Sequence, residues 1–522
     1  MNHIELFSGC GGMSLGLKKS GFELLLANEL SPMAAETFAY NFLDEDLEEK
    51  ANQNLMPQNV IWLKSKYNEL LKRLRENPFE FPDNTEEGFS DLPKDLNGLK
   101  GKLLVGNLIE LNKLLEKNVQ LKKVLSSAFK GGGNVDLISG GPPCQSFSMA
   151  GKRAKDCDKN TLPWEFAKFV NVIRPKLVLL ENVTGILRAF KDDNNNEFHA
   201  WYEVSKVFAS INYIPLCLHV NARKSGVPQN RPRFIMIGVS QKHFDSINKR
   251  FNEAEKELFK QSLCFHEMVS QEGEKLPLGH LPYFDVNKPK DLKLIKNSFL
   301  KDLVSSPETS VKDAIDDLKI NKKEKKSDYV SKLNDEFDFL KERSEIINHD
   351  FRNNSLFVKR RFRIYQVLKQ IGVTSLTTSI LNVLKGNSSD ISSKEWELLS
   401  KFNFLHENGE LLPFKCKKEF INFLKAHPTK KQTQKALIAD APAPAALSIP
   451  DDACHYDERE LRVLTVREMA RIQSFPDQFV FRSKVTTGGK MRRYEVPQYT
   501  QVGNAVPPLL ALQLGKCLKK LL

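Results

Sequence analysis

The sequence predicts an α/β fold, in which helices cover both faces of a mostly parallel β-sheet. Over the first 240 residues, short apolar segments alternate with helix-like stretches. This alternation is typical of parallel strands that are buried on both faces. Polar or glycine-rich motifs follow several of the apolar segments. Because ligands bind at the carboxyl ends of the strands in such sheets, these motifs predict one binding site along that edge.

The expected strands are short apolar runs, at residues 3–7, 21–27, 102–105, 135–139, 176–180 and 233–239. Between the second and third runs, the charged segment 44–101 has apolar residues at helical spacing over 62–74, which predicts a helical insertion on the surface. Beyond residue 240 the alternation is lost. Residues 436–450 are typical of an extended linker, and 507–515 predict a final helix with proline in its first turn.

The composition narrows the class of protein. A chain of 522 residues is long enough for a large core and at least one further domain. With 78 Lys and Arg against 65 Asp and Glu, the net charge is +13, which favours a polyanionic partner such as nucleic acid. The eight cysteines form neither a C-x-x-C pair nor a Cys/His group at zinc spacing, so we expect a reducing compartment and no metal site. We find no signal peptide and no apolar run of membrane-spanning length, so we expect a cytoplasmic protein with no membrane partner.

One cysteine stands apart from the others. The apolar run 135–139 leads into Gly140-Gly-Pro-Pro-Cys144. The two prolines fix their own φ angles and restrict the residues before them, so the turn presents the Cys144 thiol in a defined direction at little entropic cost. Most cysteines are simply small buried hydrophobic residues. We interpret Cys144 as the exception, a thiol placed for chemistry.

A glycine turn follows the first expected strand, with Gly9, Gly11 and Gly12 close together. Such glycines let the backbone approach a ligand closely, and Glu29 ends the second strand at the spacing expected of a carboxylate that binds ribose hydroxyls. Ser14 replaces the last glycine of the dinucleotide-binding pattern. The turn therefore predicts a nucleoside-containing cofactor and leaves its identity open.

Further polar groups are expected at the same edge of the sheet. Glu181-Asn-Val follows the run 176–180, and Gln-Asn-Arg231-Pro-Arg233 directly precedes the strand that ends at 239. Near the end of the chain comes Gln-Val-Gly-Asn504. Each motif has a simpler explanation when taken alone: a chance match for Glu-Asn-Val, and a salt-bridged sheet edge for the two arginines.

In combination, these motifs resemble the ordered blocks of the DNA (cytosine-5) methyltransferases of prokaryotic restriction–modification systems. The matching blocks are 7–11, 142–145, 181–183, 229–233, 467–476 and 501–504. The resemblance covers 1–240 and about 450–522 well, and the remainder only in fragments. It implies a Rossmann-like, S-adenosylmethionine-dependent catalytic domain at 1–240, completed by about 491–522. Residues 241–490 would then hold a smaller target-recognition domain and connecting segments.

The resemblance also implies roles for individual residues. Cys144 would add to C6 of cytosine, Glu181 would act at N3 and the exocyclic amine, and Arg233 would bind O2 with Arg231 bracing Glu181 and the loop. The cofactor pocket would hold S-adenosylmethionine between Phe7, Gly9, Gly11, Gly12, Glu29, Leu30, Asn107, Leu108, Leu162 and Asn504. Asn107 stands where the family usually has Asp, and its carbonyl oxygen can still accept a hydrogen bond from the adenine amine. No residue is assigned as the base that removes the C5 proton.

The expected partner is double-stranded DNA with its target base flipped out. A cognate restriction endonuclease is a possible functional partner, and we expect a monomer that associates with the nucleoid. A tRNA cytosine-5 methyltransferase would share Cys144 and Glu181, but the long variable region at 241–450 argues against it. A catalytically silent nucleic-acid-binding homologue is the second alternative, and the intact Cys144, Glu181, Arg231 and Arg233 argue against that.

Overall fold

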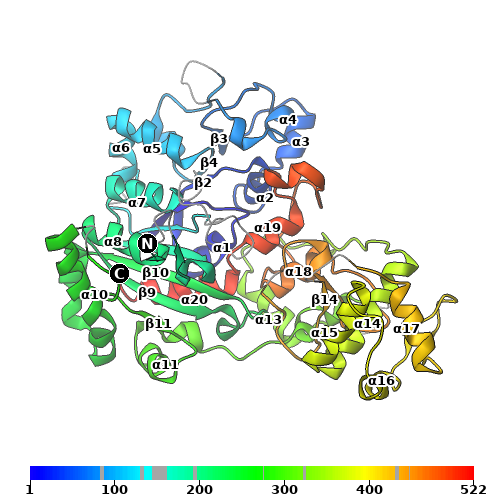
Figure 1. Cartoon of the computed structure of the whole chain (residues 1–522). Helices are drawn as coiled ribbons and strands as arrows, with labels where there is room; N and C mark the ends of the chain where they lie inside the picture. The colour runs from blue at the N-terminus through cyan, green and yellow to red at the C-terminus, as the bar shows by residue number, and fades with distance from the viewer. Residues whose placement is uncertain are drawn as a thin grey trace.

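The computed structural model describes residues 1–82, 88–129, 134–143, 161–191, 197–273, 276–320, 325–429, 434–445 and 447–522. A larger body surrounds a central sheet, and a smaller group of helices lies to one side of it (Figure 1). Cys144 lies outside the described residues. In the described part of the chain, no helix is long and apolar enough to cross a membrane.

The central sheet has nine strands in the order β11-β9-β10-β6-β5-β1-β2-β4-β3. Neighbouring strands pair in parallel except at β10, which is antiparallel to both β6 and β9. The strands are β1 Asn2–Leu6, β2 Glu23–Glu29, β3 Val60–Trp62, β4 Lys102–Val105, β5 Leu137–Gly140, β6 Leu177–Val183, β9 Tyr213–Asn221, β10 Pro232–Ser240 and β11 Tyr283–Asp285. The predicted α/β fold with a mostly parallel sheet is therefore confirmed.

Both faces of the sheet are buried. Along β6, Val178 and Leu180 pack into one hydrophobic cluster, while Leu177 and Leu179 pack into another, as the two-residue period of a strand requires. The first cluster includes residues of α5 Leu108–Lys117, α6 Val119–Ser126, α7 Leu162–Ile173 and α8 Ala200–Ser210. The second includes residues of α1 Gly12–Ser20, α9 Gln241–Ile247 and α20 Pro508–Lys519. Continuously apolar strands are the direct consequence of this arrangement.

The two ends of the chain pack against each other through glycines. A Cβ atom at Gly16 in α1 would lie 2.3 Å from the main-chain nitrogen of Leu512 in α20. A Cβ atom at Gly515 would lie 2.0 Å from Ser20 Oγ. The predicted final helix is confirmed as α20, and its close approach to α1 brings the carboxyl-terminal motifs beside the amino-terminal glycine turn.

The prediction of a helix over 62–74 is wrong. Val60–Trp62 forms the edge strand β3, which pairs with β4, and only Leu70–Arg73 is helical (α4). Trp62 is fully buried, with the guanidinium carbon of Arg73 5.6 Å from its ring centroid. Pairing with an open sheet edge and burial of the indole outweigh helical spacing here. Strands β9 and β11 were also not predicted.

The smaller group of helices has its own hydrophobic core. It contains α14 Leu356–Ile371, α15 Thr374–Leu384, α16 Ser393–Leu399 and α17 Lys417–Lys425. Strands β14 Lys435–Ala436 and β15 Ala453–Cys454 pair in parallel beside it. The basic residues of α14 are partly engaged: the Arg360 guanidinium stacks on Phe423, and the Arg361 guanidinium donates to the carbonyl of Pro428.

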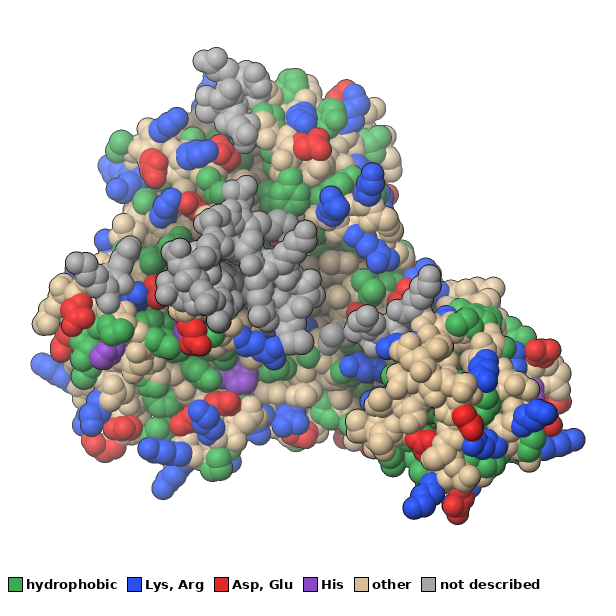
Figure 2. All heavy atoms as spheres, in the orientation of Figure 1, with side chains coloured by type: hydrophobic (Ala, Val, Ile, Leu, Met, Phe, Trp, Pro, Cys, Tyr) green, Lys and Arg blue, Asp and Glu red, His purple; other side chains and the backbone are tan. Residues whose placement is uncertain are grey.

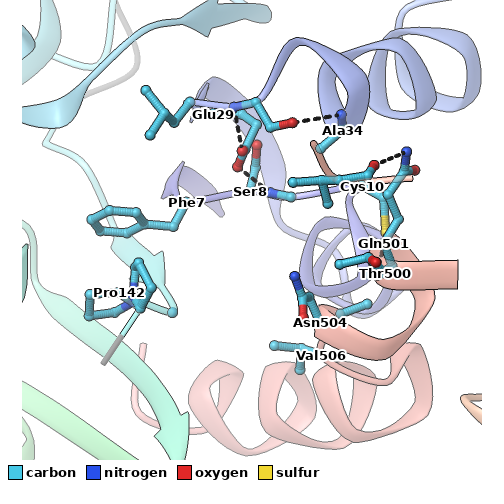
Figure 3. A pocket seen from close by; sticks show the side chains of 18 of the residues that line it. Phe7, Ser8, Cys10, Glu29, Ala34, Pro142, Thr500, Gln501, Asn504 and Val506 are labelled. Atoms are coloured by element: carbon cyan, nitrogen blue, oxygen red, sulfur yellow. Dashed lines mark hydrogen bonds between the residues drawn. The ribbon is translucent and has the colours of Figure 1, made fainter. Parts of the chain in front are cut away.

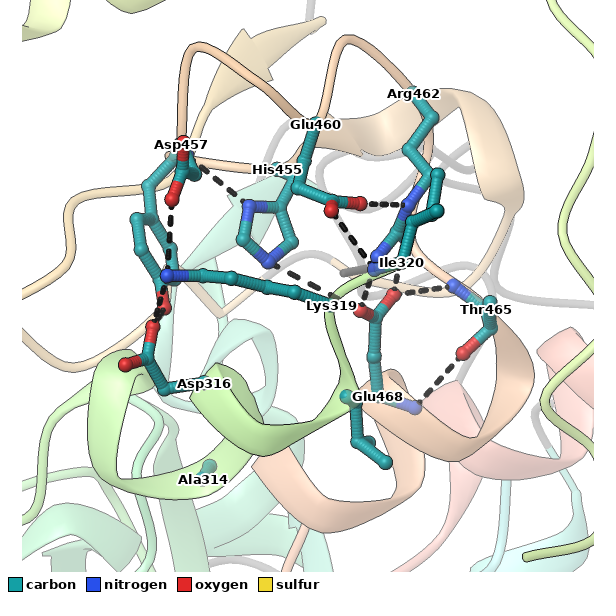
Figure 4. Close-up of polar contacts among 12 residues, drawn as sticks. Ala314, Asp316, Lys319, Ile320, His455, Asp457, Glu460, Arg462, Thr465 and Glu468 are labelled. Atoms are coloured by element: carbon teal, nitrogen blue, oxygen red, sulfur yellow. Dashed lines mark hydrogen bonds and ion pairs between the residues drawn. The ribbon is translucent and has the colours of Figure 1, made fainter. Parts of the chain in front are cut away.

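A buried polar network connects residues 316–320 with residues 455–468 (Figure 4). Lys319 Nζ pairs with Asp316 and, at 2.9 Å, with Asp457. The ring of His455 is fully buried, and its Nδ1 accepts a hydrogen bond from the main-chain N–H of Asp457. Arg462 pairs with Glu460 at 2.6 Å and with Glu468 at 2.7 Å. The buried charges therefore have charged partners, without which their desolvation would be strongly destabilising.

Candidate active site

A cavity of about 540 Å³ lies at the carboxyl edge of the parallel strands. Its walls come from residues at the carboxyl ends of β1, β2, β4, β5 and β6, or directly after them, and from the carboxyl-terminal segment 500–506. Because β10 runs antiparallel, its first residues reach the same edge. Phe7 and Pro142 lie on one side of the cavity, with Thr500, Asn504 and Val506 on the other (Figure 3).

Glu29 is held by the backbone of the glycine turn. One carboxylate oxygen accepts the N–H of Gly9 and the other accepts the N–H of Ser31, both at 2.8 Å. Burial raises the pKa of the Glu29 carboxyl group, and these backbone donors oppose the shift. Gly9 has φ +55°, and no atom lies within 4 Å of the position that a Cβ would take. The carboxylate of Glu29 and the main chain of Gly9, which carries no side chain, therefore lie next to each other in the wall of the cavity.

Glu181 and Arg233 form an ion pair in the same cavity. Arg233 Nε lies 2.6 Å from Glu181 Oε1, and each side chain is only about one-tenth exposed. Next in the chain, Asn182 Nδ2 donates to the carbonyl of Pro142 at 2.9 Å. This bond fixes the proline turn against β6. Pro142 and Pro143 line the cavity, and Cys144 is the next residue but one after Pro142, just outside the described residues.

Arg231 connects the sheet to the carboxyl-terminal motif. Its Nη2 donates to the carbonyls of Gly503, at 2.7 Å, and Ala505, at 3.0 Å. Burial lowers the pKa of the guanidinium, with a further contribution from Arg233, while Glu181 raises it. The hydrogen bonds of Arg231 hold the 503–505 turn, a connection that the sequence did not predict.

The other expected cofactor residues divide into two groups. Leu30, Leu108, Leu162 and Asn504 line the cavity, as do Phe7, Gly12 and Asn107. Asn107 also caps α5, because its Oδ1 accepts the N–H of Ile109 at 3.0 Å. Gly11 is not among the lining residues: it precedes α1 with φ +97°, and a Cβ there would lie 2.3 Å from the ring of Phe42. Close packing against Phe42 therefore explains why a glycine stands at position 11.

Several lining residues had no signal in the sequence. Pro78 and Phe79 come from the segment 44–101, and Arg492, Arg493 and Tyr494 come from the loop before α19 Gln498–Asn504. Neither stretch carries a motif. Both reach the cavity only because the chain folds back over the sheet edge.

The family model for C-5 cytosine-specific DNA methylases matches residues 1–61 and 110–520. The chain belongs to this family. It is a DNA (cytosine-5)-methyltransferase, and the family uses S-adenosylmethionine as methyl donor and DNA as substrate. The unmatched stretch 62–109 contains Phe79, Asn107 and Leu108, which all line the cavity.

Full-length relatives are type II methyltransferases. The chain is 24% identical to the type II methyltransferase M1.HphI of Haemophilus parahaemolyticus, over 100% of this chain and 87% of that protein. It is 26% identical to M.Bpa9945I of Bacillus paralicheniformis, over 99% of this chain and 98% of that protein. Among solved structures, it is similar to the Dnmt2 methyltransferase of S. pombe, with 12% identity, a TM-score of 0.38, and coverage of 100% and 98% of the two chains.

The residues around the cavity fit the methyl donor of this family. A nucleoside needs an acceptor for its ribose hydroxyls, and Glu29 presents a carboxylate held by two backbone donors. The open space beside Gly9 is where an added Cβ would intrude. The Ser8 hydroxyl is buried without a hydrogen-bond partner among the described residues, so it is available to a ligand.

Proposed function

We propose that this methyltransferase acts on a cytosine flipped out of double-stranded DNA, through a covalent bond between Cys144 and C6. The observation that carries the proposal is the Glu181–Arg233 ion pair, which shares one cavity with Glu29 and with the turn that leads to Cys144. A carboxyl group, a guanidinium and a thiol are the groups needed to activate a pyrimidine ring at N3, O2 and C6.

The chemistry follows from the weak nucleophilicity of cytosine C5. The Cys144 thiolate adds to C6, and the electron pair of the C5–C6 double bond moves to C5. The resulting negative charge is shared with N3, where the carboxyl group of Glu181, in its protonated form, donates a hydrogen bond. Arg233 stabilises the charge at O2. When bound, S-adenosylmethionine supplies an electrophilic methyl group on its sulfonium sulfur. After C5 has been methylated, the C5 proton leaves to a base, the double bond re-forms and the thiolate departs from C6.

Separate residues are proposed to hold the cofactor. Glu29 accepts from the ribose hydroxyls, and the backbone at Gly9 allows close approach. Phe7, Leu30, Leu108 and Leu162 supply apolar walls, with Gly12, Asn107 and Asn504 beside them. Gly11 does not line the cavity, and its role is to let the glycine turn pack closely against Phe42. Arg231 is a positioning residue that holds the 503–505 turn in place.

We propose that the chain divides into a catalytic domain and a target-recognition domain. Residues 1–240, completed by about 491–522, supply the catalytic domain, and 241–490 supply the recognition domain and its connections. The separate core of α14–α17 supports a unit that can vary independently of the sheet. Replacing about 330–450 with the corresponding segment of a related enzyme should change which sites become methylated. A folded chimera that kept the original sites would contradict this division.

The target sequence and the assembly state are further parts of the proposal. We propose a monomer that acts on a specific duplex sequence in the cytoplasm, associates with the nucleoid and is functionally paired with a restriction endonuclease of the same specificity. Extruding the base costs roughly a few kcal/mol, which contacts between protein and DNA must offset. Sequencing of methylated positions in DNA from cells that express the protein would identify the site.

The covalent step has a direct test. DNA that carries 5-fluorocytosine should form a stable adduct with the enzyme in the presence of S-adenosylmethionine, because fluorine cannot leave as the C5 proton does. Peptide mapping should place the adduct on Cys144. Cys144→Ser should abolish turnover and trapping while DNA and cofactor binding persist. An adduct on another cysteine would refute the proposed nucleophile.

A further inference from the structure

The loop between α18 Val466–Ile472 and α19 projects to the rim of the cavity. Its base is closed where the N–H of Gln498 donates to the carbonyl of Lys484 at 2.9 Å, and where Lys484 Nζ pairs with Glu495 at 2.6 Å. Its tip is the 3₁₀ helix η11, Gly489–Arg493, in which no residue is buried. Arg492 and Arg493 line the cavity that also holds Glu181. An anchored loop thus carries exposed cations to the entrance of the active site.

These cations differ from their neighbours in lacking acidic partners. Arg482, at the start of the loop, pairs with Asp46 at 2.8 Å and Glu48 at 3.4 Å. By contrast, no carboxylate in the described ranges forms an ion pair within 4.0 Å with any cation of η11, namely Lys490, Arg492 and Arg493. Figure 2 shows blue side chains grouped over the position that this segment occupies in Figure 1, beside α2 Pro32–Phe42 and α19.

The sign and number of these charges favour a polyanion over the cofactor as their ligand. S-adenosylmethionine carries a sulfonium, an ammonium and one carboxylate, so its net charge is positive and a cluster of cations repels it. Duplex DNA carries one negative charge per roughly 1.7 Å of helix axis. When a cytosine enters the cavity, the phosphates on either side of it are drawn to the rim. Arg492 and Arg493 of η11 lie at this rim, and Lys490 lies on the same 3₁₀ helix.

We propose that Lys490, Arg492 and Arg493 form a phosphate clamp that binds the DNA backbone beside the flipped cytosine. The proposal rests on the proposed function, because the cytosine must enter this cavity. The clamp adds affinity without sequence information, since phosphate contacts position the duplex and base contacts specify it. It also holds the backbone next to the Glu181–Arg233 pair at the moment when the base leaves the stack.

The test compares two double variants that remove equal charge from exposed 3₁₀ helices. Arg492→Gln with Arg493→Gln alters the clamp, and Lys249→Gln with Arg250→Gln alters η6 Asn248–Arg250, which does not line the cavity. Binding of a fluorescein-labelled DNA duplex is measured by anisotropy over a range of salt concentrations. The clamp variant should bind about tenfold more weakly, and the slope of log K against log salt should fall by about 1–2. The control should match the wild-type enzyme within about twofold.

Calorimetric titration with S-adenosylmethionine and thermal unfolding complete the test, and both should be unchanged in the clamp variant. An equal loss of DNA affinity in both variants would overturn the proposal, because only net charge would then matter. Weakened cofactor binding with unchanged DNA binding would overturn it as well. The two proposals fail separately: wild-type enzyme that does not methylate DNA contradicts the proposed function, whereas an unchanged salt slope in the clamp variant contradicts the clamp alone.

Discussion

Glu181 and Glu29, two of the acidic residues that line the cavity, are held by different groups, and this difference predicts opposite kinetic effects. Glu181 is paired with Arg233 at 2.6 Å, beside the turn that leads to Cys144. Glu29 is bound by the N–H groups of Gly9 and Ser31. Replacing each glutamate by glutamine keeps the size of the side chain and removes its charge.

In Glu181→Gln, the amide cannot deliver a proton toward cytosine N3. A general-acid contribution is worth about 10²–10⁴ in rate, or roughly 3–5 kcal/mol of barrier at about 1.4 kcal/mol per factor of ten. Arg233 also loses the charge of its buried partner, so the unfolding free energy should fall as well. Thermal unfolding must therefore confirm that the variant is folded at the assay temperature.

In Glu29→Gln, the ribose hydroxyls lose a charged acceptor. The amide also presents an oxygen to only one of the two backbone donors, and its NH₂ group faces the other. A hydrogen bond to a charged group is worth about 1.5–3 kcal/mol, which corresponds to a loss of cofactor affinity of about 10- to 100-fold. Methylation at saturating cofactor should change far less than in Glu181→Gln.

Transfer of tritiated methyl groups to DNA, together with calorimetric titration of S-adenosylmethionine, measures both quantities. If both variants weaken cofactor binding equally, or if both slow methylation equally at saturating cofactor, the proposed division of roles is wrong.

Three further predictions concern packing and charge. Arg231→Lys should lower the unfolding free energy by about 1–3 kcal/mol, because lysine cannot satisfy both carbonyl partners in the same geometry; denaturant titration measures this. Gly16→Ala should cost about 1–3 kcal/mol, because the added Cβ would lie 2.3 Å from the nitrogen of Leu512, whereas Gly98→Ala, with its nearest neighbour at 3.8 Å, serves as the control and should be tolerated. Burial lowers the pKa of His455 to about 4, so the unfolded state binds more protons between about pH 4 and 6.5 and stability falls as the pH drops through that window. His455→Asn keeps an acceptor for the N–H group and cannot titrate, so its stability should depend less on pH; an equal dependence would show that His455 does not carry this effect.

The motifs alone were enough to predict the sheet edge, the chemistry and the family. Glycine turns, prolines and a carboxylate after an apolar run depend on local backbone geometry, which neighbouring residues specify. The placement of Glu29, Glu181 and Arg233 around one cavity follows from strand direction. Because motifs mark the strands that precede or follow them, most of the strands that bear motifs were predicted. Strands β3, β9 and β11 carry no motif, and they were not predicted.

Other features depend on segments that are far apart in the chain. Arg231 binds carbonyls 272 and 274 residues away. Phe79 and Arg492 line one cavity although neither lies in a recognisable motif. Trp62 lies in a strand despite helical spacing around it, because β4 offers an edge to pair with. Local sequence specifies the backbone preference of each segment and its reactive groups. The packing of the whole core decides which distant segments meet. Because that packing energy is shared among many residues, no short stretch of sequence can encode it.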